Sequence, residues 1–291
     1  MRLILIHGRA QQGKDPVKLK EIWIDSLKEG LSKNGLELPG ELDIRFPYYG
    51  DRLDDLVNNK ELQNLKKDVI TRGVDSDQEA QFFYDFLNEV ADNAKIEEEA
   101  ITKNYEGDVL EKGNPLNWEW IQAILRTIDE ETGFGNEILK AFTYDVFMYL
   151  TKPGIMRVIN TIIESEVDNN PCVVVGHSLG TIIGYNILRK NGSANVKKYV
   201  TLGSPLGLKS IKNRLETPLV MPPCIKGGWF NAYDEEDYVA LNPLDKSHFN
   251  IIPSITNKND VKNRTDSRHG IEGYLDDKEV ARVIYDSLTS Q

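Results

Sequence analysis

Residues 172–184 read Cys-Val-Val-Val-Gly-His-Ser-Leu-Gly-Thr-Ile-Ile-Gly, an apolar run that passes through Gly-x-Ser-x-Gly into a second apolar run. The first run is short and rich in valine, as buried strands are, whereas the second has the spacing of a helix. A serine between a strand and a helix occupies a tight turn, and the residues two before and two after it must be small because the backbone is crowded there. Gly176 and Gly180 meet this demand. The stretch therefore predicts a strand, a sharp turn at Ser178 and a helix.

Short apolar or β-branched runs bounded by Gly, Pro or Asp recur on both sides of this stretch. They predict strands over residues 2–7, 42–46, 171–176, 196–202, 229–233 and 249–255. Apolar residues at helical spacing predict helices over residues 17–31, 155–167, 179–189 and 276–288. Because strands and helices alternate, the predicted fold class is α/β, with a mostly parallel sheet of about six or more strands flanked by helices.

One interval is too long for this rhythm, because about 125 residues separate the second and third predicted strands. Apolar residues at helical spacing occur within it at Leu53, Leu56, Val57, Leu65 and Val69, at Phe82, Phe86 and Val90, at Trp118, Ile121, Leu125 and Ile128, and at Phe142, Val146, Phe147 and Leu150. Residues 51–151 are therefore predicted to form a helical cap inserted into a core made of residues 1–50 and 152–291.

Charge is distributed unevenly along the chain. The 291 residues include 35 Lys and Arg against 46 Asp and Glu, a net charge of −11. Residues 51–150 hold 10 basic and 23 acidic residues, which leaves 25 and 23 for the rest. With no basic cluster to neutralise a row of phosphates, nucleic acid is not an expected partner, and an acidic cap disfavours docking on anionic membranes.

The composition also bears on the compartment. The first residues contain only four consecutive apolar positions, too few for a signal peptide or a membrane span. The two cysteines, Cys172 and Cys224, do not indicate a disulfide framework. We therefore expect a cytoplasmic protein without stable membrane insertion.

Within its strand and helix context, the Gly-His-Ser-Leu-Gly segment resembles the nucleophile elbow of the α/β-hydrolase superfamily, and in particular its lipase- and esterase-like members. The resemblance covers approximately residues 1–50 and 152–291. It implies a serine hydrolase that cleaves a carboxylic ester, or a related thioester or amide, of a small-molecule acyl substrate through a Ser-His-Asp triad and an acyl-enzyme. No cofactor is implied, and no His or Cys pair has the spacing of a metal site.

In this family the acid follows a later strand than the serine. Ser178 is the implied nucleophile. The acidic loop after the strand at 229–233 ends in Asp-x-Val, the position in which similar hydrolases carry the acid, and this selects Asp237. Asp234, three residues earlier in the same loop, remains the alternative.

The family's histidine follows the last strand, which implies that His269 is the base. His7 and His177 precede or adjoin the serine, and we expect both to be structural hydrogen-bonding groups. His248 follows Asp237 by only 11 residues, too few for the helix and strand that belong between them.

The oxyanion hole needs two backbone N–H groups. The turn makes the N–H of Leu179 available. The segment His7-Gly8-Arg9-Ala10 resembles the family's His-Gly-x element, which implies that Arg9 supplies the second N–H, with Ala10 as the weaker candidate. We expect the Arg9 side chain to be solvated or to contact the cap.

Other functions share parts of these patterns. Residues 8–14 read Gly-x4-Gly-Lys, as a phosphate-binding loop does, but Asp15 replaces the Ser or Thr that would hold Mg²⁺, so nucleotide hydrolysis is disfavoured. A ligand-binding or interaction protein on the same fold, or an acyltransferase with the same acyl-enzyme, remains open. Most aromatic residues of the cap are expected to pack it on the sheet domain, and a few to line an apolar acyl pocket over Ser178.

Overall fold

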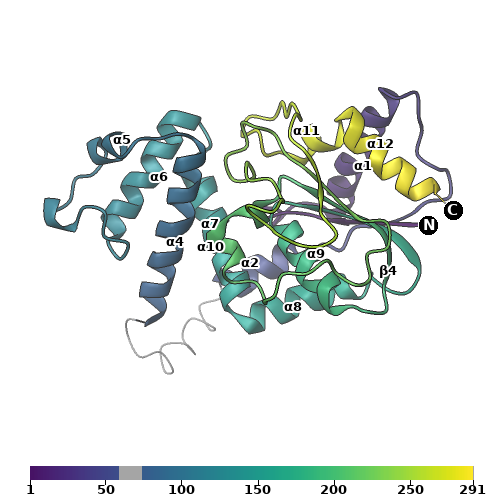
Figure 1. Ribbon diagram of the computed structural model, residues 1–291, viewed down its shortest axis with the longest axis horizontal. Coiled ribbons are helices and arrows are strands. Elements are labelled where there is room, and N and C mark those ends of the chain that lie inside the picture. The colour runs from purple at the N-terminus through teal and green to yellow at the C-terminus, as the bar shows by residue number, and fades with distance from the viewer. Residues whose placement is uncertain (59–73, 291) are drawn as a thin grey trace.

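The computed structural model describes residues 1–58 and 74–290 and contains a six-stranded sheet with the order β2-β1-β3-β4-β5-β6 (Figure 1). The strands are β1 Arg2–Ile6, β2 Asp43–Arg45, β3 Pro171–His177, β4 Asn195–Leu202, β5 Trp229–Ala232 and β6 Thr256–Lys258. Each neighbouring pair in this sheet is parallel. The predicted α/β class and its parallel sheet are confirmed.

The described helices lie between these strands and after the last one. They are α1 Pro16–Ser32, α2 Gly50–Asn58, α4 Val74–Asn93, α5 Glu98–Lys103, α6 Trp118–Thr132, α7 Asn136–Thr151, α8 Pro153–Glu164, α9 Leu179–Lys190, α10 Lys209–Lys212, α11 Ile271–Leu275 and α12 Lys278–Thr289, with 3₁₀ turns η1 Val109–Glu111 and η2 Pro205–Gly207. None of the described helices combines the length and apolar composition needed to cross a membrane.

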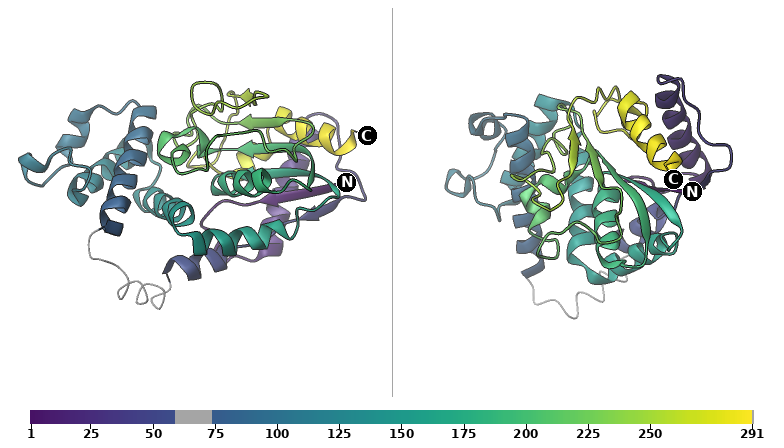
Figure 2. Two further views of the ribbon diagram at one scale, coloured as in Figure 1. Left: turned by 60° about the horizontal axis from the view of Figure 1, so that its bottom comes forward. Right: turned by 45° about the vertical axis from the view of Figure 1, so that its right-hand side comes forward.

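Different helices cover the two faces of the sheet (Figure 2). On β1, Leu3 and Leu5 join the apolar cluster formed with α1 and α12, whereas Ile4 and Ile6 join the cluster that includes α8 and α9. Successive residues of a strand point to opposite faces, so β1 contributes to both layers. All four side chains are buried, which explains why this strand reads as an unbroken apolar run.

The prediction of a strand over residues 249–255 is wrong, because the sixth strand is Thr256–Lys258. Phe249 and Ile251 are buried in the core, but they enter it from an irregular segment, and the Phe249 ring packs edge-on against Trp229. Pro253 has no N–H to donate to a ladder, which disfavours strand pairing there. The apolar pattern identifies buried residues here without identifying their secondary structure.

The interval between β2 and β3 is helical in its described part, with α4, α5 and α6 projecting away from the sheet and α7 and α8 returning the chain to it (Figure 1). Phe82 and Phe86 of α4, Ile121 of α6 and Val146 of α7 belong to one buried apolar cluster. Glu89 of α4 accepts hydrogen bonds from two backbone N–H groups at the start of α10, with N···O distances of 2.6 and 2.7 Å. The expected helical positions Leu65 and Val69 lie outside the described residues.

Candidate active site

Ser178 occupies the turn between β3 and α9 with φ 55° and ψ −126°, a backbone conformation that residues other than glycine rarely adopt. A Cβ atom on Gly180 would lie 2.3 Å from the carbonyl oxygen of Ile6, and one on Gly176 would lie 2.9 Å from that of Gly180. The backbone is therefore as crowded as the sequence predicts, and both positions require glycine. The turn brings the Ser178 side chain to the carboxyl end of the central strands.

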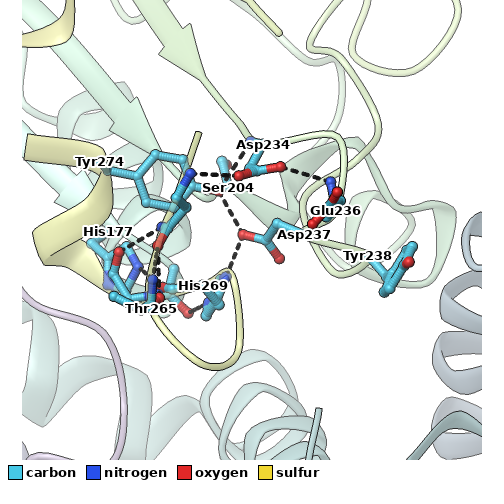
Figure 3. A network of polar contacts seen from close by, with 12 residues as sticks. His177, Ser204, Asp234, Glu236, Asp237, Tyr238, Thr265, His269 and Tyr274 are labelled. Carbon is cyan, nitrogen blue, oxygen red and sulfur yellow. Dashed lines mark hydrogen bonds and ion pairs between the residues drawn. The ribbon is translucent and has the colours of Figure 1, made fainter. Parts of the chain in front are cut away.

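Three loops bring Ser178, His269 and Asp237 into one hydrogen-bonded chain. The Nε2 atom of His269 lies 2.8 Å from the Oγ atom of Ser178, and its Nδ1 atom lies 2.6 Å from Oδ2 of Asp237. Asp237 follows β5, and His269 lies between β6 and α11. Figure 3 shows the side chains of Asp237 and His269 joined by a dashed line. With the Nδ1–H donated to the carboxylate, Nε2 is left to accept the Ser178 proton.

Asp237 and Asp234 have different partners in the same acidic loop. Asp237 is fully buried, and its Oδ2 atom also accepts a hydrogen bond from the Tyr274 hydroxyl at 2.6 Å. The carboxylate of Asp234 accepts from the backbone N–H groups of Asn263 at 2.6 Å and Glu236 at 2.8 Å. Asp234 thus joins two loops, whereas Asp237 is the carboxylate that contacts the histidine.

Sequence patterns did not single out Tyr274. It lies on α11, five residues after His269, and is buried. The one local signal is that a helix begins directly after the histidine loop, which places its first turn near the acid. The acid that accepts the hydrogen bond from this hydroxyl comes from the loop after β5, which is distant in the sequence. The local sequence around Tyr274 therefore does not predict the contact.

The two predicted structural histidines hold the backbone around the serine. The Nε2 atom of His177 lies 2.8 Å from the carbonyl oxygen of His269, and burial holds the pKa of His177 well below its usual value. The Nδ1 atom of His7 lies 2.6 Å from the carbonyl oxygen of Gly8, and the Tyr49 N–H donates to Nε2 at 3.1 Å. Burial lowers the pKa of His7 to about 4, so at neutral pH it is uncharged.

The loop after β1 lies directly against the serine. A Cβ atom on Gly8 would lie 3.0 Å from the Ser178 Cβ atom, which places the following residue, Arg9, beside the site. Leu179 is the first residue of α9. Both predicted oxyanion donors are therefore next to Ser178 in the chain or in space. Ala10, the weaker candidate, has φ 58°.

The Arg9 side chain contacts α7, which belongs to the helical segment that α4 to α7 form between β2 and β3. Its Nε atom lies 2.8 Å from Oδ2 of Asp145 on α7, and its Nη1 atom donates to the carbonyl oxygen of Ile138 at 3.0 Å. Burial raises the pKa of Asp145, and the Arg9 charge opposes that effect. Of the two environments expected for the Arg9 side chain, solvent or the predicted cap, the structure shows the second, because Asp145 and Ile138 lie within residues 51–151.

A cavity of about 390 Å³ opens beside Ser178 and His269. Its apolar walls are Leu19, Ile22 and Trp23 of α1 on one side and Phe134, Ile138 and Phe142 from the helical segment on the other. Lys14 and Glu272 also line it. A second hollow of about 170 Å³, bounded by Tyr49 and Asp145, lies along the same Gly8–Ala10 loop but is not lined by the serine or the histidine.

The phosphate-loop pattern of residues 8–14 folds into a different arrangement. The Gly13 N–H donates to the carboxylate of Asp51 at 2.6 Å, and the Lys14 ammonium lies 3.2 Å from the side-chain oxygen of Gln11. A carboxylate on that amide occupies the place where a phosphate oxygen would bind. Across residues 1–58 and 74–290, no three His, Cys, Asp or Glu side chains converge as metal ligands would.

Compared with protein-family models, curated proteins and solved structures, the chain matches none of them.

Proposed function

We propose that this protein is a serine hydrolase of the α/β-hydrolase type that cleaves a carboxylic ester, or a related thioester or amide, through Ser178, His269 and Asp237. The observation that carries the proposal is the continuous chain of hydrogen bonds from the Asp237 carboxylate through the His269 ring to the Ser178 hydroxyl. This chain ends on a serine in the sharp strand-to-helix turn. An aligned acid, base and nucleophile are the arrangement that activates a serine for acyl transfer.

In the first half of the reaction, the Ser178 oxygen attacks the substrate carbonyl carbon while His269 Nε2 takes the hydroxyl proton. Asp237 holds the ring in the required tautomer and stabilises the imidazolium ion. The backbone N–H groups of Leu179 and Arg9 are the proposed donors to the oxyanion. The imidazolium then gives its proton to the departing alcohol, thiol or amine as the acyl–oxygen, acyl–sulfur or acyl–nitrogen bond breaks.

In the second half, water attacks the acyl group on Ser178, and His269 takes a proton from that water. Collapse of the second oxyanion breaks the bond to Ser178, which recovers its proton from His269, and a carboxylic acid leaves. The cavity supports a small substrate, because its volume of about 390 Å³ is near the lower end of the about 300–1,000 Å³ range of ligand pockets. The apolar walls of the cavity favour a substrate with an apolar part.

A fluorophosphonate tests the proposal, because only an activated serine displaces the fluoride and gains a stable phosphonyl group. Intact mass and peptide mapping of the full chain should show one adduct, on Ser178, that is absent in Ser178→Ala. Ser210→Ala is a matched control, since Ser210 is also buried and its hydroxyl has no hydrogen-bond partner among the described residues. It should be labelled like the wild type.

An adduct on Ser178 would justify a panel of esters, thioesters and amides graded by acyl length, with added alcohols or amines to reveal acyl transfer. Wild-type protein that remains unlabelled at millimolar reagent would overturn the proposal. A ligand-binding role on the same fold would then be the better explanation.

A further inference from the structure

Tyr274 lies behind the acid of the proposed triad. Its side chain is fully buried, and its hydroxyl donates to Oδ2 of Asp237 at 2.6 Å while accepting from the backbone N–H of Asp234 at 3.3 Å (Figure 3). The hydroxyl therefore joins the acidic loop after β5 to the helix that follows the histidine. Burial and the neighbouring carboxylate raise the pKa of Tyr274, so the hydroxyl stays protonated at neutral pH.

The Asp237 carboxylate depends on few donors. Both hydrogen bonds to it, from His269 Nδ1 and from the Tyr274 hydroxyl, fall on Oδ2. The Oδ1 atom is buried and has no partner in the part of the chain that the structure describes. A buried carboxylate needs hydrogen bonds to remain charged, and Tyr274 supplies one of the two that side chains give here.

Two donors on one oxygen share its negative charge. A hydroxyl donor lowers the charge that Oδ2 presents to His269, so its removal strengthens the attraction between the carboxylate and the imidazolium ion. The stronger attraction favours the protonated ring. The hydroxyl thus controls how readily the ring holds a proton, besides fixing where the carboxylate lies.

The other titratable groups around His269 are already engaged or lie at the cavity wall. His177 is buried and neutral beside it, and Arg268 pairs with Glu236 at 3.0 Å. Arg9 pairs with Asp145. Lys14 and Glu272 line the cavity and carry opposite charges.

We propose that Tyr274 is a positioning residue that sets the proton affinity of His269 through its hydrogen bond to Asp237, an inference that rests on the proposed function. Tyr274→Phe is a clean test because the ring is held independently of the hydroxyl. A Cβ on Gly203 would come within 3.0 Å of the Tyr274 ring, and the ring contacts that of His177 at a centroid distance of 6.1 Å. The phenylalanine ring fills the same space without a donor.

The primary measurement is an NMR pH titration of the His269 ring in the full-length protein, with the signal assigned by its loss in His269→Ala. In Tyr274→Phe we expect the midpoint of the His269 titration to move to higher pH. Site-specific 3-fluorotyrosine at position 274, a stronger donor, should shift the pKa of His269 in the opposite direction. This second variant keeps the buried hydroxyl, so it gives an answer if Tyr274→Phe does not fold.

Tyr185→Phe is the matched control. Tyr185 is also buried, and its hydroxyl bonds to the backbone of Val220 instead of the proposed triad. It should leave the pKa of His269 unchanged, which separates a hydrogen-bond effect from a general loss of buried tyrosine hydroxyls.

Fluorophosphonate labelling of Ser178 against pH gives the functional readout. We expect the lower limb of the rate profile to move to higher pH in Tyr274→Phe by the same amount as the NMR titration. An unchanged pKa of His269 together with normal labelling of the wild type would overturn this inference alone. Failure of the wild type to be labelled would overturn the proposed function, and the inference with it.

Discussion

The two sides of the cavity hold their residues by different forces. On the sheet side, partly or fully buried hydrogen bonds fix the positions of Ser178, His269 and Asp237. On the helical side, Phe134 and Phe142 face the site through apolar contacts, and their rings lie about 6 Å from that of His269. One ion pair, between Arg9 and Asp145, joins the loop beside the serine to α7.

This difference predicts a division of labour between the sides. Hydrogen bonds are directional and fix atoms to within tenths of an ångström, whereas apolar contacts follow area and tolerate substitutions of similar volume. Changes on the sheet side should therefore reduce kcat. Changes on the helical side should alter KM and the choice of substrate.

The largest effect should follow loss of the nucleophile or the base. Ser178→Ala and His269→Ala should each lower kcat by about 10⁶-fold, because either change removes the acyl-enzyme route. Ester hydrolysis checks this, with thermal unfolding as the measure of folding. The matched control is His248→Ala, a half-buried histidine paired with Asp245 at 3.0 Å, which should retain wild-type turnover. Substantial turnover in Ser178→Ala would refute the division.

The two aspartates of the acidic loop should respond unequally. Asp237→Asn should lower kcat by about 10⁴-fold because the amide favours the wrong histidine tautomer. Asp234→Asn should instead lower stability, since it disturbs the bonds to the Asn263 and Glu236 backbones, and should change kcat far less. Steady-state kinetics and denaturant unfolding of both variants measure the contrast. The reverse order of kcat losses would move the acid to Asp234.

The buried His7, directly after β1, should make the stability of the folded protein sensitive to acid. The unfolded chain takes up a proton on His7 near pH 6.5, whereas the folded protein does so only near pH 4. Between these values unfolding binds a proton, so stability falls as pH falls, by about 3 kcal/mol for this group. His7→Asn, which keeps a donor for the Gly8 carbonyl, should lose less stability than the wild type over that window. If the free energies of urea unfolding of His7→Asn and the wild type fell equally with pH, His7 would not be the source of the acid sensitivity.

The ion pair between Arg9 and Asp145, which joins the two sides, should contribute moderately to the free energy of unfolding. Asp145→Asn leaves the Arg9 guanidinium, whose side chain is 13% exposed, without an anionic partner, so stability should fall by about 1–3 kcal/mol. Asp25→Asn, which breaks an exposed pair with Lys28, should cost less than about 1 kcal/mol. Thermal unfolding compares the two, and equal losses would show that the Arg9 pair has no special role.

The smallest effect is expected at the cavity mouth. Ile138 lines the cavity and is 54% exposed, so Ile138→Ala should raise KM for esters with longer acyl chains about two- to tenfold and leave kcat nearly unchanged. Ile252→Ala removes a more exposed isoleucine outside the cavity and should change neither constant. A fall in kcat with constant KM in Ile138→Ala would break the proposed division between the two sides.

How much of the molecule was predictable depends on the range of the interaction. The turn at Ser178 is recognisable from the five residues 176–180, because Gly176 and Gly180 are required by the crowding around it. The location of β6 was missed because an apolar run with a proline reports burial without reporting pairing. Which individual side chains meet Arg9 and Asp237 was beyond prediction, since nothing near either residue encodes the contact with Asp145 of α7 or with Tyr274 of α11.

The position of β1 between β2 and β3 has a consequence for how the chain can vary. The long segment from Arg45 to Pro171 begins on β2 and ends on β3, and these two strands pair with β1 from opposite sides. The central sheet therefore forms only when both ends of the segment reach β1. For a flexible connection, the entropy of closure grows only with the logarithm of length, about 0.6 kcal/mol for each doubling. Closure entropy therefore places little limit on the length of this segment, whereas α7 and α8 are held in it by the buried apolar contacts that they make with the core.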